Sequence, residues 1–447
     1  MTTDTIAALA TAPGRGAVGI LRLTGPHAAD IAQHLCGTLP APRLARVRTF
    51  RDAAGAALDR GLVLWFPGPH SYTGEDVVEL QGHGGPVVLQ LLLGAACALG
   101  ARIARPGEFS ERAFLNGRID LAQAEAVADL IDAATTGAAR AAQRSLEGEL
   151  SRRVQARVEE LTALRVFVEG ALDFSDQDVD WLGDGELRQR LAALVAGLDE
   201  LRAQAAQGRR LRDGMVITLT GRPNVGKSTL LNRLAGAEVA IVTEHPGTTR
   251  DLLREQIDLG GLPLTLIDSA GLRESPDPVE QEGVRRARAA IGRAELALFL
   301  LDDRAGLTAE DHALLASMPA GPEVLLLHNK CDLTGNPPVM FEADGHAHLR
   351  LSAATGAGLE LLTAALHARA GLTAGESPFS ARTRHVEALR RALAFVRDAQ
   401  QRLLEGATPE LAAEELRLAQ DALGEITGRV TSEDLLGRIF AGFCIGK

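Results

Sequence analysis

One segment of the chain restricts the possible folds more than any other. Residues 221–228 match the pattern G-x-x-x-x-G-K-[ST], in which a glycine loop ends in Lys227 and Ser228. A strand-like run at 215–220 precedes the loop, and a helical pattern continues from it to residue 234. Backbone amides in such a turn face phosphate groups, and the following helix presents its amino terminus to them. The pattern therefore predicts a phosphate-binding loop, with Lys227 on the β- and γ-phosphates and Ser228 on Mg²⁺.

Lysine usage supports this interpretation. The chain has three lysines among 47 basic residues, namely Lys227, Lys330 and Lys447. In a chain that otherwise uses arginine, a remaining lysine indicates a position where arginine would not serve. A compact ammonium group fits between phosphate oxygens, whereas the guanidinium fork is too wide for that cradle.

Two further motifs complete the expected phosphate side of the site. Residues 268–271 follow an apolar strand, where Asp268 can hold Mg²⁺ through water and the Gly271 amide can sense the γ-phosphate. Thr248 and Thr249 lie between the glycine loop and that strand, where a threonine can complete the Mg²⁺ shell. The order of these motifs predicts a nucleoside triphosphate with its metal ion.

The base side of the site is predicted from two later segments. Asn329, Lys330 and Asp332 follow the strand-like run 324–327, and the Asp332 carboxylate can accept from guanine N1–H and the exocyclic amine. Adenine offers an acceptor in place of the N1 donor, so it would leave that carboxylate unpaired. Residues 352–354, which include Ser352 and Ala353, form the usual fifth element beside the base. The base is therefore predicted to be guanine.

The sequence does not identify the residue that orients the attacking water. Many GTPases place a glutamine directly after the 268–271 motif, but this chain has Leu272, which can neither donate nor accept a hydrogen bond. Glu280 and Glu282 in the acidic loop that follows are candidates to orient the water. On pattern alone, each of them is better explained as a solvated loop charge.

Three kinds of secondary-structure pattern divide the chain into domains. Short strand-like runs with glycine loops come first, a helical part follows, and strands alternate with helices from residue 214 before helices return after residue 371. The alternation predicts a parallel sheet with crossover helices. The predicted fold class is multidomain α/β. It has an α+β domain at 1–118, an all-α helical domain at 119–212 and 374–447, and an inserted P-loop GTPase domain at 213–373.

Two helical patterns are predicted in detail. Apolar residues recur at steps of three or four from Leu146 to Val168, which indicates one face of a long helix. The most apolar run, at 86–99, is interrupted by Gln90 and is too short to span a bilayer. It is predicted to be a buried helix.

Composition narrows the partners and the compartment. The formal net charge is −11, so a nucleic acid would have to meet a local basic patch. Cys36, Cys97, Cys331 and Cys444 form no Cys-x-x-Cys pair and no metal-ligand spacing, which favours a reducing cytoplasm. The amino terminus has no basic region of the kind that begins a signal peptide.

With these motifs the chain resembles the TrmE–Era-like GTPases, and among them the tRNA-modification members. The resemblance covers essentially the whole chain, including the inserted GTPase domain. The segments that carry it are residues 13–16, 71–76, 81–85, 105–110, 121–126, 221–228 and 443–447.

The resemblance implies a second site in the amino-terminal domain. In this family that domain dimerises and binds a tetrahydrofolate derivative, a 5,10-methylene or 5-formyl form. Carried over by motif, Arg22, Glu79, Arg118 and Lys447 would line the folate site, although the family usually has lysine at position 118. From the residues alone, Arg22 and Glu79 could equally form a structural ion pair.

The resemblance also implies K⁺-dependent GTP hydrolysis by paired GTPase domains. The potassium site would use Asn224, Thr243, the His245 carbonyl and Thr248, and a cation beside the β–γ bridge can act as an arginine finger does elsewhere. Glu280 matches the family's water-activating glutamate. The combined set of candidate GTP-binding residues is Asn224, Val225, Gly226, Lys227, Ser228, Thr229, Thr243, Thr248, Thr249, Asp268, Gly271, Asn329, Lys330, Asp332, Ser352 and Ala353.

The implied reaction is modification of carbon-5 of the wobble uridine of certain tRNAs. A homodimer would act with the flavoprotein MnmG, and the added group would be of the carboxymethylaminomethyl type. Cys444 is either a reactive thiol near the folate and the base or a small residue that packs the tail. The alternative function is a switch GTPase in ribosome assembly, and a weaker one is a folate-dependent transferase acting alone.

Overall fold

The computed structural model describes residues 4–173, 185–237, 254–268, 294–318, 321–371, 379–404, 409–430 and 433–446. The chain divides into two compact units. The first contains residues 1–128, 146–191 and 394–447, and the second contains residues 129–145 and 192–393. The domain boundaries predicted at residues 118, 212 and 373 stay a prediction.

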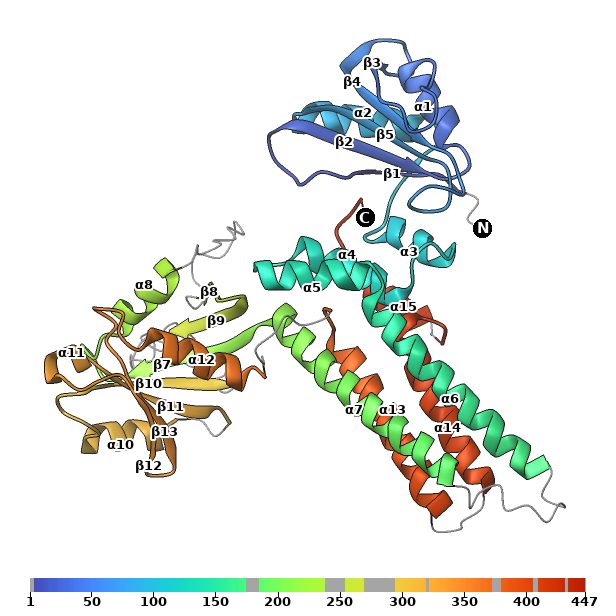
Figure 1. Ribbon diagram of the computed structural model, residues 1–447. Coiled ribbons are helices and arrows are strands. Elements are labelled where there is room, and N and C mark those ends of the chain that lie inside the picture. Colours follow the sequence, from blue (N-terminus) through green and yellow to red (C-terminus); the bar gives the residue numbers. More distant parts are fainter. Residues whose placement is uncertain are drawn as a thin grey trace. The chain divides into compact units, whose positions relative to one another are not determined.

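The amino-terminal part of the first unit is a six-stranded sheet in the order β3-β4-β5-β2-β1-β6 (Figure 1). Its central pairs are antiparallel, and only the short β6 runs parallel to its neighbour β1. The elements are β1 (Ile6–Leu9), β2 (Gly16–Thr24), α1 (Ala28–Cys36), β3 (Arg46–Arg51), β4 (Ala57–Phe66), β5 (Val77–Gly84), α2 (Pro86–Ala98), β6 (Arg102–Ile103) and α3 (Glu108–Leu115).

Helices α1 and α2 both pack against β5 and enclose the apolar core of this domain. The helix predicted at 86–99 is present as α2, but the prediction that it is buried holds for one face only. Leu92 and Ala96 are buried, but Val87 is 72% exposed and Leu91 52% exposed on the opposite face. One apolar side of the helix covers the sheet, and the other apolar side is exposed in the described part of the chain.

Helices make up the rest of the first unit, and several of them belong wholly or partly to the second. Helices α6 and α14 pack side by side, and Arg165 of α6 donates to Gln420 Oε1 of α14 at 2.6 Å. The helices are α4 (Leu121–Ile131), α5 (Thr136–Leu146), α6 (Glu149–Asp173), α7 (Gly185–Asp213), α13 (Thr383–Leu404), α14 (Pro409–Thr427) and α15 (Glu433–Ala441).

The predicted apolar face of the long helix is confirmed, but its start is wrong. Leu150, Val154 and Val168 are all buried along α6. Leu146 instead ends the preceding helix α5, because Gly148 adopts φ +85° between the two helices. That left-handed backbone conformation interrupts a right-handed helix and suits glycine.

The second unit contains a seven-stranded sheet in the order β12-β13-β11-β10-β7-β9-β8. The strands are β7 (Met215–Gly221), β8 (Arg254–Leu259), β9 (Leu262–Asp268), β10 (Leu296–Asp302), β11 (Glu323–Asn329), β12 (Met340–Ala343) and β13 (His346–Arg350). The helices are α8 (Lys227–Ala237), α10 (Ala309–Ala316), α11 (Cys331–Thr334) and α12 (Leu359–Arg369).

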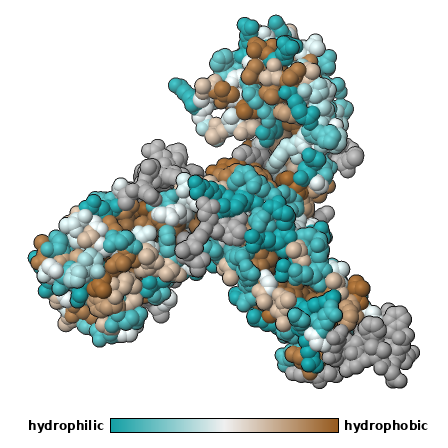
Figure 2. Space-filling model, in the orientation of Figure 1, coloured by the Kyte–Doolittle hydropathy of each residue, from teal (hydrophilic) through white to brown (hydrophobic). Residues whose placement is uncertain are grey.

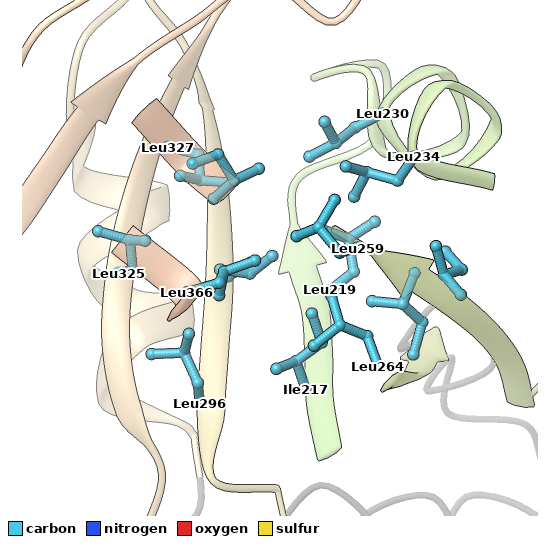
Figure 3. Packing of buried hydrophobic residues seen from close by; sticks show 14 of the residues in the cluster. Ile217, Leu219, Leu230, Leu234, Leu259, Leu264, Leu296, Leu325, Leu327 and Leu366 are labelled. Carbon is cyan, nitrogen blue, oxygen red and sulfur yellow. The ribbon is translucent and has the colours of Figure 1, made fainter. Parts of the chain in front are cut away.

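The predicted parallel sheet with crossover helices is confirmed for the interior of this sheet. Neighbouring strands from β13 to β9 are parallel, whereas β12 and β8 pair antiparallel at the two edges. Leucine and isoleucine side chains of the central strands meet Leu230 and Leu234 of α8 and Leu366 of α12 (Figure 3). This core places the carboxyl ends of parallel strands at one edge, where polar loops gather.

Hydrophilic and charged side chains lie on the surface of the helices. Hydrophilic residues predominate on the visible face of α5 and the start of α6 (Figure 2). Arg152 and Arg153 there both pair with Glu149, at 2.7 Å. None of the helices in the described part of the chain has the length and apolar character needed to cross a bilayer.

Candidate functional site

The glycine loop lies where the sequence predicts it, between β7 and the amino terminus of α8. Gly226 adopts φ +103°, and a β-carbon there would lie 2.3 Å from Asn329 Nδ2, so only glycine fits. Lys227 Nζ donates to Gly221 O at 2.6 Å and to Arg222 O at 2.8 Å. The loop therefore holds its own lysine beside the helix amino terminus, where an anion is favoured.

We call residues 329–332 the base loop. Asn329, which is 2% exposed, fastens this loop to the glycine loop. Its Nδ2 donates to Val225 O and its Oδ1 accepts from Ala353 N, both at 2.8 Å. One side chain thus ties together the phosphate loop, the end of β11 and the 352–353 segment. Because both of its partners are main-chain groups, this arrangement depends little on the surrounding side chains.

Lys330 makes a second connection between the same loops. Its Nζ donates to Asn224 O at 2.8 Å and to Asp302 Oδ2 at 2.9 Å. Hydrogen bonds from Arg304 and then from Lys330 hold the pKa of Asp302 well below its usual range. Asp302 therefore stays ionised and keeps Lys330 in place. Sequence reasoning missed Asp302, although its place at the carboxyl end of a parallel strand was a usable signal.

The remaining described candidates surround these loops. Ser228 and Thr229 are exposed in the first turn of α8, and Asp332 is exposed in α11. Ser352 is buried, and its Oγ accepts from Thr355 N at 3.2 Å. The structure thus leaves Asp332 accessible to a base while the residues around it are fixed.

Part of the predicted site lies outside the described residues. Asp268 ends β9 directly beside Leu219 of β7, which leads into the glycine loop. The structure therefore brings Asp268, the first residue of this motif, to the strand that leads into the phosphate loop. The candidates that lie outside the described residues are Thr243, His245, Thr248, Thr249, Gly271 and Glu280.

The second predicted site begins with an ion pair on neighbouring strands. Arg22 of β2 lies directly opposite Glu79 of β5, and Arg22 Nη2 is 2.8 Å from Glu79 Oε1. Arg22 also donates from Nη1 to Gly446 O at 3.3 Å, and its guanidinium lies 5.8 Å from the centre of the Phe109 ring. The pair that the sequence left open therefore exists, and it also contacts the carboxyl-terminal tail.

Two glycines allow the tail to approach this closely. At Gly446, with φ +99°, a β-carbon would lie 2.5 Å from Leu9 O. At Gly107, with φ +68°, it would lie 2.6 Å from Phe440 O, and Gly107 N donates to Cys444 O at 3.4 Å. Cys444 itself is exposed, and Lys447 lies outside the described residues. The tail is thus packed against the amino-terminal domain through its backbone.

The loop at 71–76 supplies residues that the site prediction missed. Tyr72 Oη lies 2.8 Å from Ser110 Oγ, and burial raises the pKa of Tyr72. The stem of Arg118 packs over Gly74 of the same loop, where a β-carbon would lie 3.3 Å from Arg118 Cγ. The segments 71–76 and 105–110 were recognised in the sequence, so Tyr72, Phe109 and Ser110 could have been found there.

The class of protein is defined by the phosphate loop, the base loop hydrogen-bonded to it and the sheet that carries both loops. It is a P-loop GTPase whose GTPase domain lies within a longer helical and α+β chain.

Comparisons with known proteins identify the family. The model of the "MnmE helical domain" matches residues 121–444, and that of the "GTP-binding protein TrmE N-terminus" matches residues 5–118. The tRNA modification GTPase MnmE of Hydrogenovibrio crunogenus is 52% identical over all of this chain and 99% of its own. The protein of the same name from Nitrosococcus oceani is 53% identical over 99% of this chain and 97% of its own. The chain therefore belongs to the MnmE family of tRNA modification GTPases.

Solved structures give a weaker similarity. Era of Aquifex aeolicus bound to GDP–AlF₄⁻ covers 40% of this chain and 66% of its own, with 25% identity. Its TM-score of 0.27 is too low to support a conclusion. The family assignment rests on the family models and the full-length relatives, and it confirms the resemblance found in the sequence.

Proposed function

We propose that this chain hydrolyses GTP as part of the enzymatic modification of tRNA. The observation that carries the GTP part is the pair of hydrogen bonds made by Asn329, which donates to Val225 O and accepts from Ala353 N. These two bonds fix the base loop relative to the phosphate loop. Asp332 then accepts from guanine N1–H and the exocyclic amine. Lys227 contacts the β- and γ-phosphates, and Ser228 binds Mg²⁺.

The substrate part of the proposal is supported by family membership. Relatives that match this chain along its whole length are named tRNA modification GTPases. We assign to this chain modification of carbon-5 of the wobble uridine, in the cytoplasm, as a homodimer together with MnmG. The flavin of that partner would supply the redox chemistry.

The proposed one-carbon donor is a tetrahydrofolate derivative held by the amino-terminal domain. Arg22, Glu79, Arg118 and Lys447 are its proposed ligands, and Tyr72 is added because it lies at the same surface. Two features of the residues fit such a molecule. The guanidinium of Arg22 suits a carboxylate or carbonyl oxygen, and the Glu79 carboxylate suits ring N–H donors. Cys444 is exposed beside this site, and we propose it as a thiol that acts on the substrate.

Hydrolysis is proposed to require K⁺ and Glu280. Leu272 cannot orient the water, so the family's glutamate, Glu280 in this chain, takes that role. Asn224, Thr243, His245 and Thr248 are the proposed potassium ligands. The cation would supply positive charge at the β–γ bridge.

The test of this function is nucleoside analysis of tRNA. A strain that lacks the gene would be complemented with the wild-type chain, with Asp332→Ala or with Asn336→Ala as an exposed control. The proposal predicts that wild type and Asn336→Ala restore the modified wobble uridine and that Asp332→Ala does not. Normal wobble modification in the deletion strain, together with defective ribosome profiles, would favour the switch GTPase of ribosome assembly instead.

The potassium site has a separate test. GTP hydrolysis by the purified chain would be compared in KCl and NaCl at equal ionic strength, with Asn224→Ala in parallel. We expect at least tenfold stimulation by K⁺ that Asn224→Ala abolishes, because removing the cation withdraws transition-state charge stabilisation. Equal rates in both salts would refute the potassium site and leave the tRNA proposal standing.

A further inference from the structure

The geometry points to the α4–α5 loop as the place where the helices respond to whether GDP or GTP is bound. We call residues 132–135 the α4–α5 loop. The inference names one hydrogen bond, from Thr135 to the turn between β8 and β9, as the contact that transmits the change. It rests on the GTP site proposed above.

The contact itself is direct and buried. Thr135 Oγ1 donates to Gly261 O at 3.0 Å, and Thr135 is 5% exposed. The same oxygen accepts from Ala138 N at 3.1 Å and so caps α5. Gly137 lies so close to the turn that a β-carbon there would be 3.1 Å from Gly261 O. A displacement of the turn therefore acts directly on the first turn of α5.

The other end of the same hairpin leads to the nucleotide motifs. Strands β8 and β9 are paired in register from Arg254 opposite Ile267 to Leu259 opposite Leu262. Asp268 ends β9, and Thr249 precedes β8 by five positions in the sequence. Both motifs, which are expected to bind Mg²⁺ or the γ-phosphate, therefore join this hairpin at the end opposite to Gly261. Because β8 and β9 are joined by ladder hydrogen bonds along their whole length, a shift at the open end of the hairpin would be carried to its turn.

The turn is held rigidly enough to act as a unit. Gly261 N donates to Asp258 Oδ1 at 2.7 Å, which closes the turn. His367 Nε2 of α12 lies 2.7 Å from Leu259 O. These bonds fix the conformation of the turn, so a shift of β8 and β9 displaces Gly261 O with them.

A second set of bonds provides a fixed point next to the moving contact. Asp129 of α4 accepts through Oδ1 from Arg212 and from Arg382, each at 2.7 Å, and its side chain is 4% exposed. Arg212 precedes the GTPase domain in the chain and Arg382 follows it. We call these three residues the Asp129 clamp. The clamp holds the two chain segments that carry Arg212 and Arg382 to Asp129, six residues before Thr135. A shift at Thr135 therefore changes the conformation of the α4–α5 loop while Asp129 stays in place.

The test is amide hydrogen exchange of the full chain with GDP and with a non-hydrolysable GTP analogue. Wild type is expected to exchange amides of residues 132–142 at rates that differ at least threefold between the two nucleotides. Thr135→Ser keeps both hydrogen bonds and should retain this difference. Thr135→Val loses both, and Thr135→Asp keeps the cap of α5 but cannot donate to Gly261 O. Both of these variants should lose the difference while GTP hydrolysis stays within about twofold.

Thr162→Val is the matched control, because Thr162 Oγ1 also donates to a carbonyl, Val158 O at 2.7 Å, within α6. Nucleotide binding would be measured in the same samples. Binding of both nucleotides without a difference in wild-type exchange would overturn the inference alone. An undiminished difference in Thr135→Asp would overturn it too, whether or not Thr135→Val folds. Failure to bind GTP at all would overturn the proposed function as well.

Discussion

In the nucleotide site, the groups that bind one another come from one continuous stretch of chain between Gly221 and Ala353, and main-chain oxygens and amides make most of the bonds. In the amino-terminal site, Arg22 reaches Gly446, 424 positions away in the sequence. The first site can form once its own sheet has folded. The second requires that the two ends of the chain meet. The difference teaches that one site is local to a domain, whereas the other depends on a contact between the amino-terminal sheet and the carboxyl-terminal tail.

The largest effect should come from breaking the local site at its centre. Asn329→Ala leaves Val225 O and Ala353 N without their partner, at about 1–3 kcal/mol for each unpaired buried group. We expect GTP affinity to fall by about 100-fold or more, which corresponds to about 2.7 kcal/mol. Titration with a fluorescent guanine nucleotide would measure this loss.

Asn336→Ala provides the control for that variant. Asn336 Nδ2 donates to Asp303 Oδ2 at 2.9 Å, but the residue is exposed. Its GTP affinity should stay within about twofold. Folate binding should be unchanged in both variants, and a parallel loss of folate binding in Asn329→Ala would show that the two sites are not independent.

The next effect concerns how the nucleotide domain is fastened. Asp129→Ala leaves Arg212 and Arg382 without their shared carboxylate, and we expect a loss of about 2–3 kcal/mol because both guanidinium groups keep some solvent contact. Asp421→Ala removes an exposed pair with Arg417 and should cost less than about 1 kcal/mol. Urea unfolding followed by circular dichroism compares the two. Equal midpoints would contradict a clamp at Asp129.

A charge swap separates the two interpretations of the amino-terminal pair. Arg22→Glu combined with Glu79→Arg keeps opposite charges on directly opposed residues of β2 and β5. We expect the thermal midpoint to recover most of what either single variant loses. Folate affinity, measured by calorimetry with 5-formyl-tetrahydrofolate, should remain at least tenfold below wild type. Full recovery of folate binding would mean that the pair is structural only.

The smallest effect is a dependence of stability on pH in the nucleotide domain. Burial and the neighbouring His348 lower the pKa of His328, while Asp303 opposes the shift. His328 is therefore protonated less readily in the folded chain than in the unfolded chain, and its Nε2 lies 2.9 Å from His348 Nδ1. As the pH falls below about 6.5, the unfolded chain takes up this proton before the folded chain does, so the free energy of unfolding falls with the pH.

The expected slope for this single group is at most about 1.4 kcal/mol per pH unit. Urea unfolding of wild type and His328→Gln at pH 7.5 and 5.5 would measure it. The variant should show a smaller loss than wild type between the two pH values. The same loss in both proteins would exclude His328 as its origin.

The sequence predicted the local site far better than the distributed one, for a physical reason. The phosphate loop and the base loop are short segments in which residue type, spacing and the preceding strand together determine the geometry, so Asn329 and Lys227 were found directly. Asp302 was missed because its role depends on which strands become neighbours in the sheet. In the amino-terminal site the pairing of Arg22 with Glu79 depends on strand register, which no motif specifies.

Helices were predicted well where periodicity was long. The apolar face of α6 was correct from Leu150 onward. The error at Leu146 came from a glycine whose backbone conformation a periodic pattern does not register. Similarly, hydropathy alone could not show that one face of α2 is exposed, because it does not specify what packs on each face.

The measurement that tests the central comparison most directly is binding of folate and GTP to Gly446→Val. A β-carbon at this position would meet Leu9 O at 2.5 Å, whereas Gly442→Val, the control in the same tail, would meet its nearest neighbour at 3.6 Å. We expect Gly446→Val to lose at least tenfold in affinity for 5-formyl-tetrahydrofolate with GTP affinity unchanged, and Gly442→Val to bind both as wild type does. Unchanged folate affinity in Gly446→Val, or an equal loss for both ligands, would contradict a folate site that depends on the ends of the chain meeting.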